Sequence, residues 1–308
     1  MDTVLQWCTR QLGTAEVLSD RSKEHPGHAS GTWHLKTPVG FCYLKVHDDA
    51  LHWANEVHAY EHWACAFGDR APSLLAVRDV PPLALVVSEI PGEILEGMHL
   101  DPRTERAIWR EAGEALPALH ELESGASLGP CNRDGTPVGA PRPDAVTAIA
   151  ERFAQDIERA IQGASVSETE LVTLRAAHDL IPAFAGERPT PCHRDYCAAN
   201  WLVDEDGNWA GVIDFEFAYW DVRVVDFARD PNWAWVIRPD LVAAFMEGYG
   251  RPLSAAAEQQ CLVARAEYAL GAILWGRDNA YYRFAREGHE ALAYLRDLLG
   301  GETWTTRD

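Results

Sequence analysis

"PCHRDYCAANWLVDEDGNWAGVIDFEFA", residues 191–218, contains three polar residues whose spacing determines how the chain is interpreted. Asp195 and Asn200 lie five residues apart, and Asp214 ends the next apolar segment. The segments "NWLV" and "WAGVID" have the composition of strands. "DEDGN" between them has turn chemistry, with a glycine that adopts positive φ readily. The stretch is therefore expected to form a β-hairpin.

The register of this hairpin predicts which side chains meet. With the turn centred on Gly207, Leu202 lies opposite Val212 and Asn200 lies opposite Asp214. Amide and carboxylate oxygens are ligands that Mg²⁺ accepts, together with waters and substrate phosphates. We therefore expect Asn200 and Asp214 to be metal ligands.

Asp195 precedes the first strand and can reach the same point as a general base for a substrate hydroxyl. The alternative is that Asp and Asn flank strands only because they form turns, which is the commoner explanation for any single residue. The joint spacing H-x-D-x-x-x-x-N, followed by a strand pair ending I-D-F, is much more specific than the single residues.

The totals are those of a globular protein. The chain has 308 residues, 47% of them hydrophobic and 24% charged, enough for one large domain or two modest ones. No run of about 18 apolar residues exists, so no membrane helix is expected. The start, "MDTVLQWCTRQLG", mixes charged and apolar residues and indicates a first helix instead of a secretory signal.

Charge and cysteine usage narrow the possible partners. The net charge of −20 repels nucleic acids and anionic membranes and attracts a cationic ligand, although it can also serve solubility alone. Seven scattered cysteines without a C-x-x-C pair indicate neither a zinc site nor a disulfide framework. They favour a reducing cytoplasm.

The first part of the chain is expected to be rich in β-structure. Residues 31–49 alternate around a Pro/Gly turn and predict a hairpin, with Lys45 on one face of its second strand. Residues 48–68 predict a helix with a buried stripe that includes Val57. Residues 81–92 predict an apolar strand that closes a small first lobe.

Helical signals dominate from about residue 92 onward, apart from the hairpin of residues 191–218 and a loop rich in Gly and Pro at residues 124–144. Residues 240–308 are also expected to be helical. The fold class is therefore α+β, with a β-rich lobe over residues 1–90 and a larger helical lobe over residues 91–308. Apolar stripes support the helices: Ile108, Ala112, Leu116 and Leu119; Val146, Ile149, Phe153, Ile157 and Ile161; and Leu171, Leu174 and Ile181.

These motifs resemble those of the aminoglycoside phosphotransferase and choline kinase family, which are relatives of protein kinases. "HRDYCAAN" (193–200) resembles the catalytic loop of the family, and "IDFEFA" (213–218) resembles its metal-binding motif. "RVVDFAR" (223–229) resembles the segment that carries a structural Asp, here Asp226. The resemblance implies a bilobal protein-kinase-like fold.

The resemblance also implies roles for individual residues. Asp195 would be the catalytic base, Asn200 and Asp214 would hold Mg²⁺, and Lys45 would bind the phosphates of ATP or GTP. A helix Glu would hold Lys45. Glu56 and Glu61 both flank the buried stripe, so periodicity leaves both open, whereas the family pattern favours Glu56.

The remaining nucleotide contacts rest on weaker motifs. "VVSEIPG" (86–92) resembles the hinge strand of the family, which implies backbone contacts with the nucleotide base near Ser88 and Ile90. "GHASGTWH" (27–34) offers the backbone of Ser30 to phosphates, or it is an ordinary surface loop.

One departure from the family concerns Arg194, which stands where antibiotic kinases often have Gly and gives the protein-kinase spelling "HRD". The chain has no D-F-G, no A-P-E and no recognisable activation loop, which argues against a protein substrate. By resemblance His193 and His120 are structural.

Family acceptors bind in the helical lobe, where aromatic side chains beside carboxylates suit a cationic or nucleoside-like ligand. The alternative is that these aromatic side chains belong to the core. The candidate acceptor residues are Tyr219, Asp230, Trp233 and Asp278.

The leading function is a small-molecule O-kinase that acts on an antibiotic or another natural product and confers resistance or self-protection. A metabolite kinase for choline, homoserine or an amino sugar is the alternative. A nucleotide-binding protein without catalysis is a third possibility, and it fits the presence of all four motif residues less well.

Overall fold

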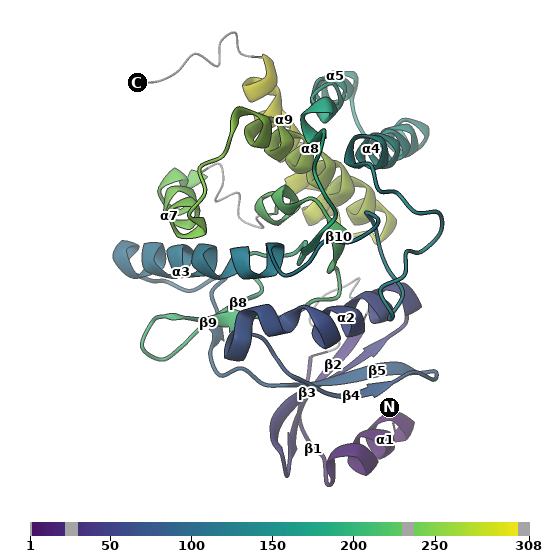
Figure 1. Ribbon diagram of the computed structural model, residues 1–308, viewed down its shortest axis with the longest axis vertical. Helices are drawn as coiled ribbons and strands as arrows, with labels where there is room; N and C mark the ends of the chain where they lie inside the picture. Colours follow the sequence, from purple (N-terminus) through teal and green to yellow (C-terminus); the bar gives the residue numbers. More distant parts are fainter. Residues whose placement is uncertain (1, 22–29, 230–236, 301–308) are drawn as a thin grey trace.

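The computed structural model describes residues 2–21, 30–229 and 237–300. Among these, the residues up to 88 form a five-stranded antiparallel sheet, two helices and a 3₁₀ segment (Figure 1). The sheet order is β1-β2-β3-β5-β4. The elements are α1 (Asp2–Leu12), β1 (Glu16–Asp20), β2 (Ser30–Thr37), β3 (Gly40–His47), α2 (Ala50–His62), η1 (Ala64–Arg70), β4 (Leu74–Arg78) and β5 (Leu83–Ser88).

The alternation of side chains along β3 and β5 separates the two faces of the sheet. Leu44 and Val86 pack with α1 on one face, in a small cluster of their own. Leu85 and Val87 point the other way and join the main core, to which Val57 of α2 also belongs. In Figure 1 the sheet accordingly lies between α1 and α2.

The helix α2 begins after the Asp pair, as expected, but it ends at His62, six residues before the expected end. The Asp49 side chain accepts hydrogen bonds from the N–H groups of Leu51 and His52, which caps the N-terminus. The helical path continues into η1, where Gly68 breaks the geometry at φ +58°. Trp53, Val57, Tyr60 and Ala64 are all buried, as the stripe predicts.

The second lobe is mostly helical and contains short strands. Its elements are β6 (Glu93–Ile94), α3 (Pro102–His120), α4 (Ala145–Gln162), α5 (Glu168–His178), η2 (Ile181–Phe184), β7 (Thr190–Cys192), β8 (Trp201–Val203), β9 (Trp209–Val212), β10 (Tyr219–Asp221), η3 (Arg223–Phe227), α7 (Pro239–Tyr249), α8 (Ala255–Asp278) and α9 (Tyr282–Gly300). Residues 124–144 form no helix and only isolated β-bridges, as expected for a loop.

The hairpin β8–β9 forms, but its predicted register is wrong by one residue. Trp201, not Leu202, lies opposite Val212. The Asp204 side chain accepts a hydrogen bond from the Asn208 N–H, so the strands next to the turn pair with a register that differs from the predicted one by two residues. A bulge after Leu202 then reduces this difference to one residue.

At the open end of this hairpin, Ile213 N–H donates to Asn200 C=O at 3.0 Å, so Asn200 lies opposite Ile213 instead of Asp214. Asp214 is the next residue. The two predicted ligands therefore still lie at the same end of the hairpin.

The stripes on the helices are confirmed with one exception. Ile149 and Phe153 of α4 are buried, whereas Ile161 is 48% exposed. Each step of four residues rotates 40° past a full turn, so three steps carry Ile161 about 120° away from Ile149. Ala160 is buried in its place.

Candidate active site

Lys45 joins the two lobes. Cys42 and Leu44 of β3 point toward α1, so Lys45 points to the opposite face of the sheet. Its Nζ lies 2.6 Å from Glu56 Oε1 in α2 and 2.7 Å from Asp214 Oδ1 just after β9. These bonds tie the first sheet to the segment after β9 in the second lobe.

The structure distinguishes between the two helix carboxylates. Glu56 is fully buried, and its second oxygen lies 2.8 Å from His47 Nε2. Glu61 faces away and forms a partly exposed ion pair with Arg133. Sequence reasoning did not single out His47, although the strand period places it on the same face as Lys45.

Lys45 and Asp214 each stabilise the charged form of the other. Burial opposes the charge of Lys45, but the carboxylates of Asp214 and Glu56 outweigh this effect and hold the pKa of Lys45 well above its usual value. Burial likewise opposes the charge of Asp214, yet the charge of Lys45 and its hydrogen bond lower the pKa of Asp214. Glu216, 3.7 Å from Lys45 Nζ, adds a further carboxylate. Lys45 and Asp214 are therefore both charged at neutral pH.

Asp195 lies in the loop before β8 and is 5% exposed. Asn200 Nδ2 donates to Asp195 Oδ2 at 2.8 Å and to the Asp195 backbone carbonyl at 2.9 Å. Because both donors of this amide are engaged, its oxygen remains to bind a cation. The guanidinium of Arg229 forms an ion pair with Asp195 Oδ1.

His193 holds this loop in place. Its Nδ1 accepts from the Asp195 N–H at 3.3 Å, so the proton lies on Nε2, which donates to Ile213 C=O at 3.1 Å. The ring thus links the loop before β8 to the segment that follows β9. Both ring nitrogens are engaged in the scaffold, in agreement with the expected structural role.

Asp226 anchors the same loop from η3. Its carboxylate accepts from the backbone N–H groups of His193 and Arg194 and from His120 Nε2, which lies 2.9 Å away. The carboxylate is almost completely buried. Asp226 is therefore a structural residue, and His120 at the end of α3 supports it.

Arg194 has a left-handed backbone, with φ +63°. Its guanidinium lies 3.8 Å from the ring centre of Tyr219, and its Nε lies 3.1 Å from Asp221. Asp221 also binds Arg152 of α4, which in turn binds Glu267 of α8. The network fixes a residue whose conformation glycine would adopt more easily.

The predicted acceptor residues do not come together in the described part of the chain. One face of the Tyr219 ring is covered by Arg194. Asp278 is exposed and forms an ion pair with Arg159. It lies eleven residues beyond Glu267, about 16 Å farther along α8. Asp230 and Trp233 lie outside the described residues.

The predicted contacts for the nucleotide base lie at the end of β5. The Glu89 N–H is already engaged by Phe41 C=O, and the Ser88 N–H by Ser73 C=O. In the ranges that the structure describes, no residue accepts from the Ile90 N–H. Ser30 begins β2, where its backbone pairs with His47.

The donor set fits a magnesium ion. Asn200 offers an amide oxygen and Asp214 a carboxylate oxygen that Lys45 does not use, on a side chain that is 37% exposed. Asp214 has φ +68°, a sparsely populated conformation that often marks functional residues. An amide oxygen and a carboxylate with room for waters and phosphates match the preference of Mg²⁺.

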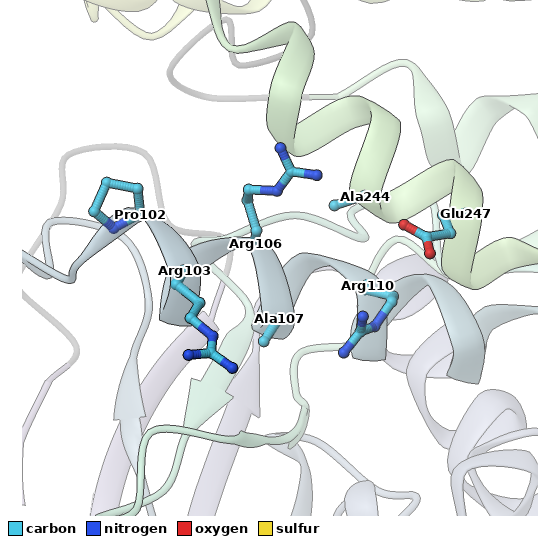
Figure 2. Close-up of a pocket in the computed structure, with 7 residues that line it drawn as sticks. All are labelled: Pro102, Arg103, Arg106, Ala107, Arg110, Ala244 and Glu247. Carbon is cyan, nitrogen blue, oxygen red and sulfur yellow. The ribbon is translucent and has the colours of Figure 1, made fainter.

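A surface hollow of about 460 Å³ lies elsewhere, between α3 and α7 (Figure 2). Three arginines of α3, Arg103, Arg106 and Arg110, line it opposite Glu247 of α7. None of its lining residues belongs to the site around Lys45 and Asp195.

The model of the phosphotransferase enzyme family matches residues 22–262. The chain belongs to this family. Lys45, Asp195, Asn200 and Asp214 all lie within the matched range. A kinase-like fold, with a small antiparallel sheet and a helical lobe, is thereby confirmed.

Relatives of this phosphotransferase differ in their substrates. A homoserine kinase of Phenylobacterium zucineum (strain HLK1) is 32% identical over 197 residues, which are 61% of this chain. The match spans 54% of that relative, about half its length.

Solved structures of aminoglycoside phosphotransferases have the same fold. A thermostable mutant of APH(4)-Ia, in a ternary complex with ADP and hygromycin B, has a TM-score of 0.74 at 16% identity, covering 98% of this chain and 100% of that one. The GDP complex of aminoglycoside 2'-phosphotransferase-IIIa has a TM-score of 0.69 at 12% identity, covering 96% and 98%.

Proposed function

We propose that this phosphotransferase is a magnesium-dependent small-molecule O-kinase. It would move the γ-phosphate of ATP or GTP to a hydroxyl group. One observation carries the proposal: Lys45 bridges Glu56 and Asp214, while Asp195 and Asn200 are bonded together in the adjoining loop. The arrangement provides a phosphate-binding cation, a metal-binding pair and a base in one place.

The donor side of the site binds the nucleotide. Glu56 holds the ammonium group of Lys45 in position for the phosphates. Asn200 and Asp214 would hold Mg²⁺, which neutralises phosphate charge when bound. The backbone near Ser88 and Ile90 would meet the base. The backbone of Ser30 would lie near the phosphates.

Asp195 acts on the acceptor side as the general base. Its carboxylate takes the proton of the acceptor hydroxyl while the hydroxyl oxygen bonds to the γ-phosphorus. The bond from phosphorus to the β–γ bridging oxygen breaks, and the nucleoside diphosphate leaves with that oxygen. The bond from Asn200 orients the carboxylate.

We propose an antibiotic or related natural product as the acceptor, cationic or nucleoside-like in character. Structural neighbours bind aminoglycosides, and the net charge of −20 favours a cationic acceptor. The product would be an inactivated antibiotic. Neither a nucleic acid nor a membrane is part of this proposal.

An amino-acid-like metabolite is the second candidate acceptor. Homoserine kinase is the name of the 32% identical relative, whereas the two aminoglycoside kinases described above are 16% and 12% identical. The third possibility, a nucleotide-binding protein without catalysis, would leave the contact of Asp195 with Asn200 without a function.

We also propose that residues 1–90 form the nucleotide lobe and residues 91–308 the acceptor lobe. The protein would work in the cytoplasm, where seven free cysteines remain reduced.

Across the ranges that the structure describes, no helix has both the length and the apolar character needed to cross a membrane.

Incubation with Mg²⁺ and a panel of acceptors tests the proposal. The panel contains aminoglycosides, nucleoside and peptide antibiotics, choline and homoserine, each with ATP and with GTP, and mass spectrometry reads the acceptor. One acceptor should gain a phosphoryl group with the wild type but not with Asp195→Ala. If titration shows Mg-nucleotide binding and no acceptor gains mass, a binding protein becomes the better description.

A further inference from the structure

Arg229 contacts the proposed base, and the family motifs do not account for it. It follows η3, and its guanidinium forms an ion pair with Asp195 Oδ1. The same guanidinium lies 5.8 Å from the ring centre of Tyr268 in α8. The Arg229 side chain is 23% exposed, so it has access to solvent only at its edge.

The site around Asp195 has more carboxylates than cations. Lys45 is held between Glu56 and Asp214 on the donor side. Arg194, next to the base in the sequence, forms an ion pair with Asp221 instead. Among the residues that the structure describes, the guanidinium of Arg229 is the cationic group that contacts the Asp195 carboxylate.

The surroundings of Arg229 have spare hydrogen-bonding capacity. Tyr268 Oη is buried, and within the described ranges it has no hydrogen-bond partner. Burying a hydroxyl group without a partner costs free energy, unless a ligand completes the site. An oxygen-rich group near Arg229 would provide that partner.

Phosphoryl transfer requires positive charge around the three equatorial oxygens of the moving group. An arginine supplied within the same chain can provide this charge in some phosphotransferases and raises kcat by roughly 10³–10⁵-fold. Its planar fork suits phosphate oxygens, and it stays protonated throughout. Arg229 contacts Oδ1 of Asp195, whereas Asn200 bonds to Oδ2, so a hydroxyl that approached Oδ1 would come beside the guanidinium.

We infer that Arg229 is a second catalytic residue, which stabilises the phosphoryl group during its transfer. The inference rests on the proposed kinase function. In the free enzyme, Arg229 is held by Asp195. When the acceptor hydroxyl donates a hydrogen bond to the Asp195 carboxylate, the guanidinium of Arg229 leaves that carboxylate. It then bonds to oxygens of the γ-phosphoryl group. Asp195 receives the proton, the phosphoryl group goes to the acceptor, and Arg229 gains and loses nothing.

Two substitutions at Arg229 and one control test this role. Arg229→Gln removes the charge, and Arg229→Lys keeps the charge without the fork. Arg251→Gln is the matched control, because it breaks an exposed Arg–Glu pair with Glu121. Activity is measured on the acceptor identified by the panel and as slow hydrolysis of Mg-nucleotide.

We expect Arg229→Gln to lower kcat by about 10³-fold or more, with the Kd of Mg-ADP changed less than about threefold. Arg229→Lys should recover part of the loss. A second measurement does not depend on turnover, because aluminium fluoride mimics the phosphoryl group during transfer. Mg-ADP with aluminium fluoride should raise the unfolding temperature of the wild type further than Mg-ADP alone. This extra rise should disappear in Arg229→Gln and remain in Arg251→Gln.

Three outcomes would overturn the inference. In the first, kcat is unchanged and only KM for the acceptor rises, which makes Arg229 an acceptor-binding residue. In the second, both variants lose stability but keep both kcat and the aluminium fluoride effect, which makes it structural. In the third, the wild type neither binds Mg-nucleotide nor transfers phosphate, which removes the kinase function as well. If Arg229→Gln does not fold, Arg229→Lys carries the comparison.

Discussion

At the scale of single residues, the pairing of Lys45 with Glu56 is the contact most open to a direct test. Substitution of a buried ion-pair partner leaves the other charge undersatisfied and costs about 3 kcal/mol or more. Glu56→Gln should therefore lower the free energy of unfolding by about 3 kcal/mol and weaken Mg-nucleotide binding. Urea unfolding and nucleotide titration measure the two effects.

Glu61→Gln is the matched control, because it also replaces a glutamate of α2 by glutamine. Its ion pair with Arg133 is partly exposed, so the change should cost at most about 1 kcal/mol and leave nucleotide binding intact. Equal effects of the two substitutions would contradict the assignment of Glu56.

Arg194 offers a second test at this scale, because its backbone has a conformation that glycine prefers. A residue with a Cβ pays about 1 kcal/mol or more at φ +63°. Both Arg194→Ala and Arg194→Gly lose the bond to Asp221, but only the glycine variant relieves the backbone. Arg194→Gly should therefore be more stable than Arg194→Ala by about 1 kcal/mol in urea unfolding.

Arg175, an exposed residue of α5, is the control position for the same two substitutions. There the alanine variant should be more stable than the glycine variant. In a helix Gly is less favourable than Ala by about 1 kcal/mol. If Arg194→Ala were instead more stable than Arg194→Gly, the backbone strain assigned to Arg194 would be wrong.

At the scale of elements, the start of α5 is stabilised by a reciprocal cap. Ser167 and Glu170 form a capping box, and Glu170 also lies 2.6 Å from His289 of α9. Burial raises the pKa of Glu170, but the hydrogen bonds from Ser167 and His289 outweigh it and lower that pKa. The carboxylate of Glu170 is thus favoured in the folded state.

Glu170→Gln should lower the free energy of unfolding by about 1 kcal/mol at pH 7. Because the folded pKa lies below the unfolded value of about 4.3, the contribution is complete above that pH and is lost as pH falls through the folded pKa. The gap between the wild type and the variant should narrow as the pH falls below about 4.3. A gap of constant size from pH 7 to pH 3 in urea unfolding would contradict this account.

Elements were predictable from the sequence where one physical pattern dominated. The stripe of α2 and its Asp cap placed that helix, and the strand period placed Lys45. The hairpin register was missed by one residue, because the Asp204 side chain closes the turn and a bulge follows. Ile161 was misplaced because steps of four residues drift around a helix.

The candidate site was predictable only where its residues share a motif. Asp195, Asn200 and Asp214 lie within twenty residues of one another, and two of them form one hairpin end. Arg229 ends the segment "RVVDFAR", but that segment does not predict its contact with Asp195, because the contact depends on how the chain after η3 packs against the loop before β8. The partners of Asp278 likewise depend on the packing of α4 against α8, which no local pattern encodes.

At the scale of the whole molecule, the bond between Lys45 and Asp214 crosses from the first lobe to the second. A nucleotide bound there would contact both lobes and stabilise them together. At a concentration of 100 times its Kd, Mg-nucleotide should add about 2.7 kcal/mol to the free energy of unfolding.

Removal of Mg²⁺ with EDTA should abolish most of this stabilisation, because Asn200 and Asp214 bind phosphates through the metal in the proposed site. Differential scanning fluorimetry with and without EDTA measures it. A stabilisation that EDTA does not change would argue against a metal at these two residues.

The central claim is that Asp195 is the base of a phosphoryl transfer. Its most direct test is the rate of transfer by Asp195→Asn relative to the wild type, at saturating Mg-nucleotide and with the acceptor identified by the panel. We expect kcat to fall by about 10²–10⁴-fold, with the Kd of Mg-nucleotide nearly unchanged. Transfer by Asp195→Asn at the wild-type rate would contradict it.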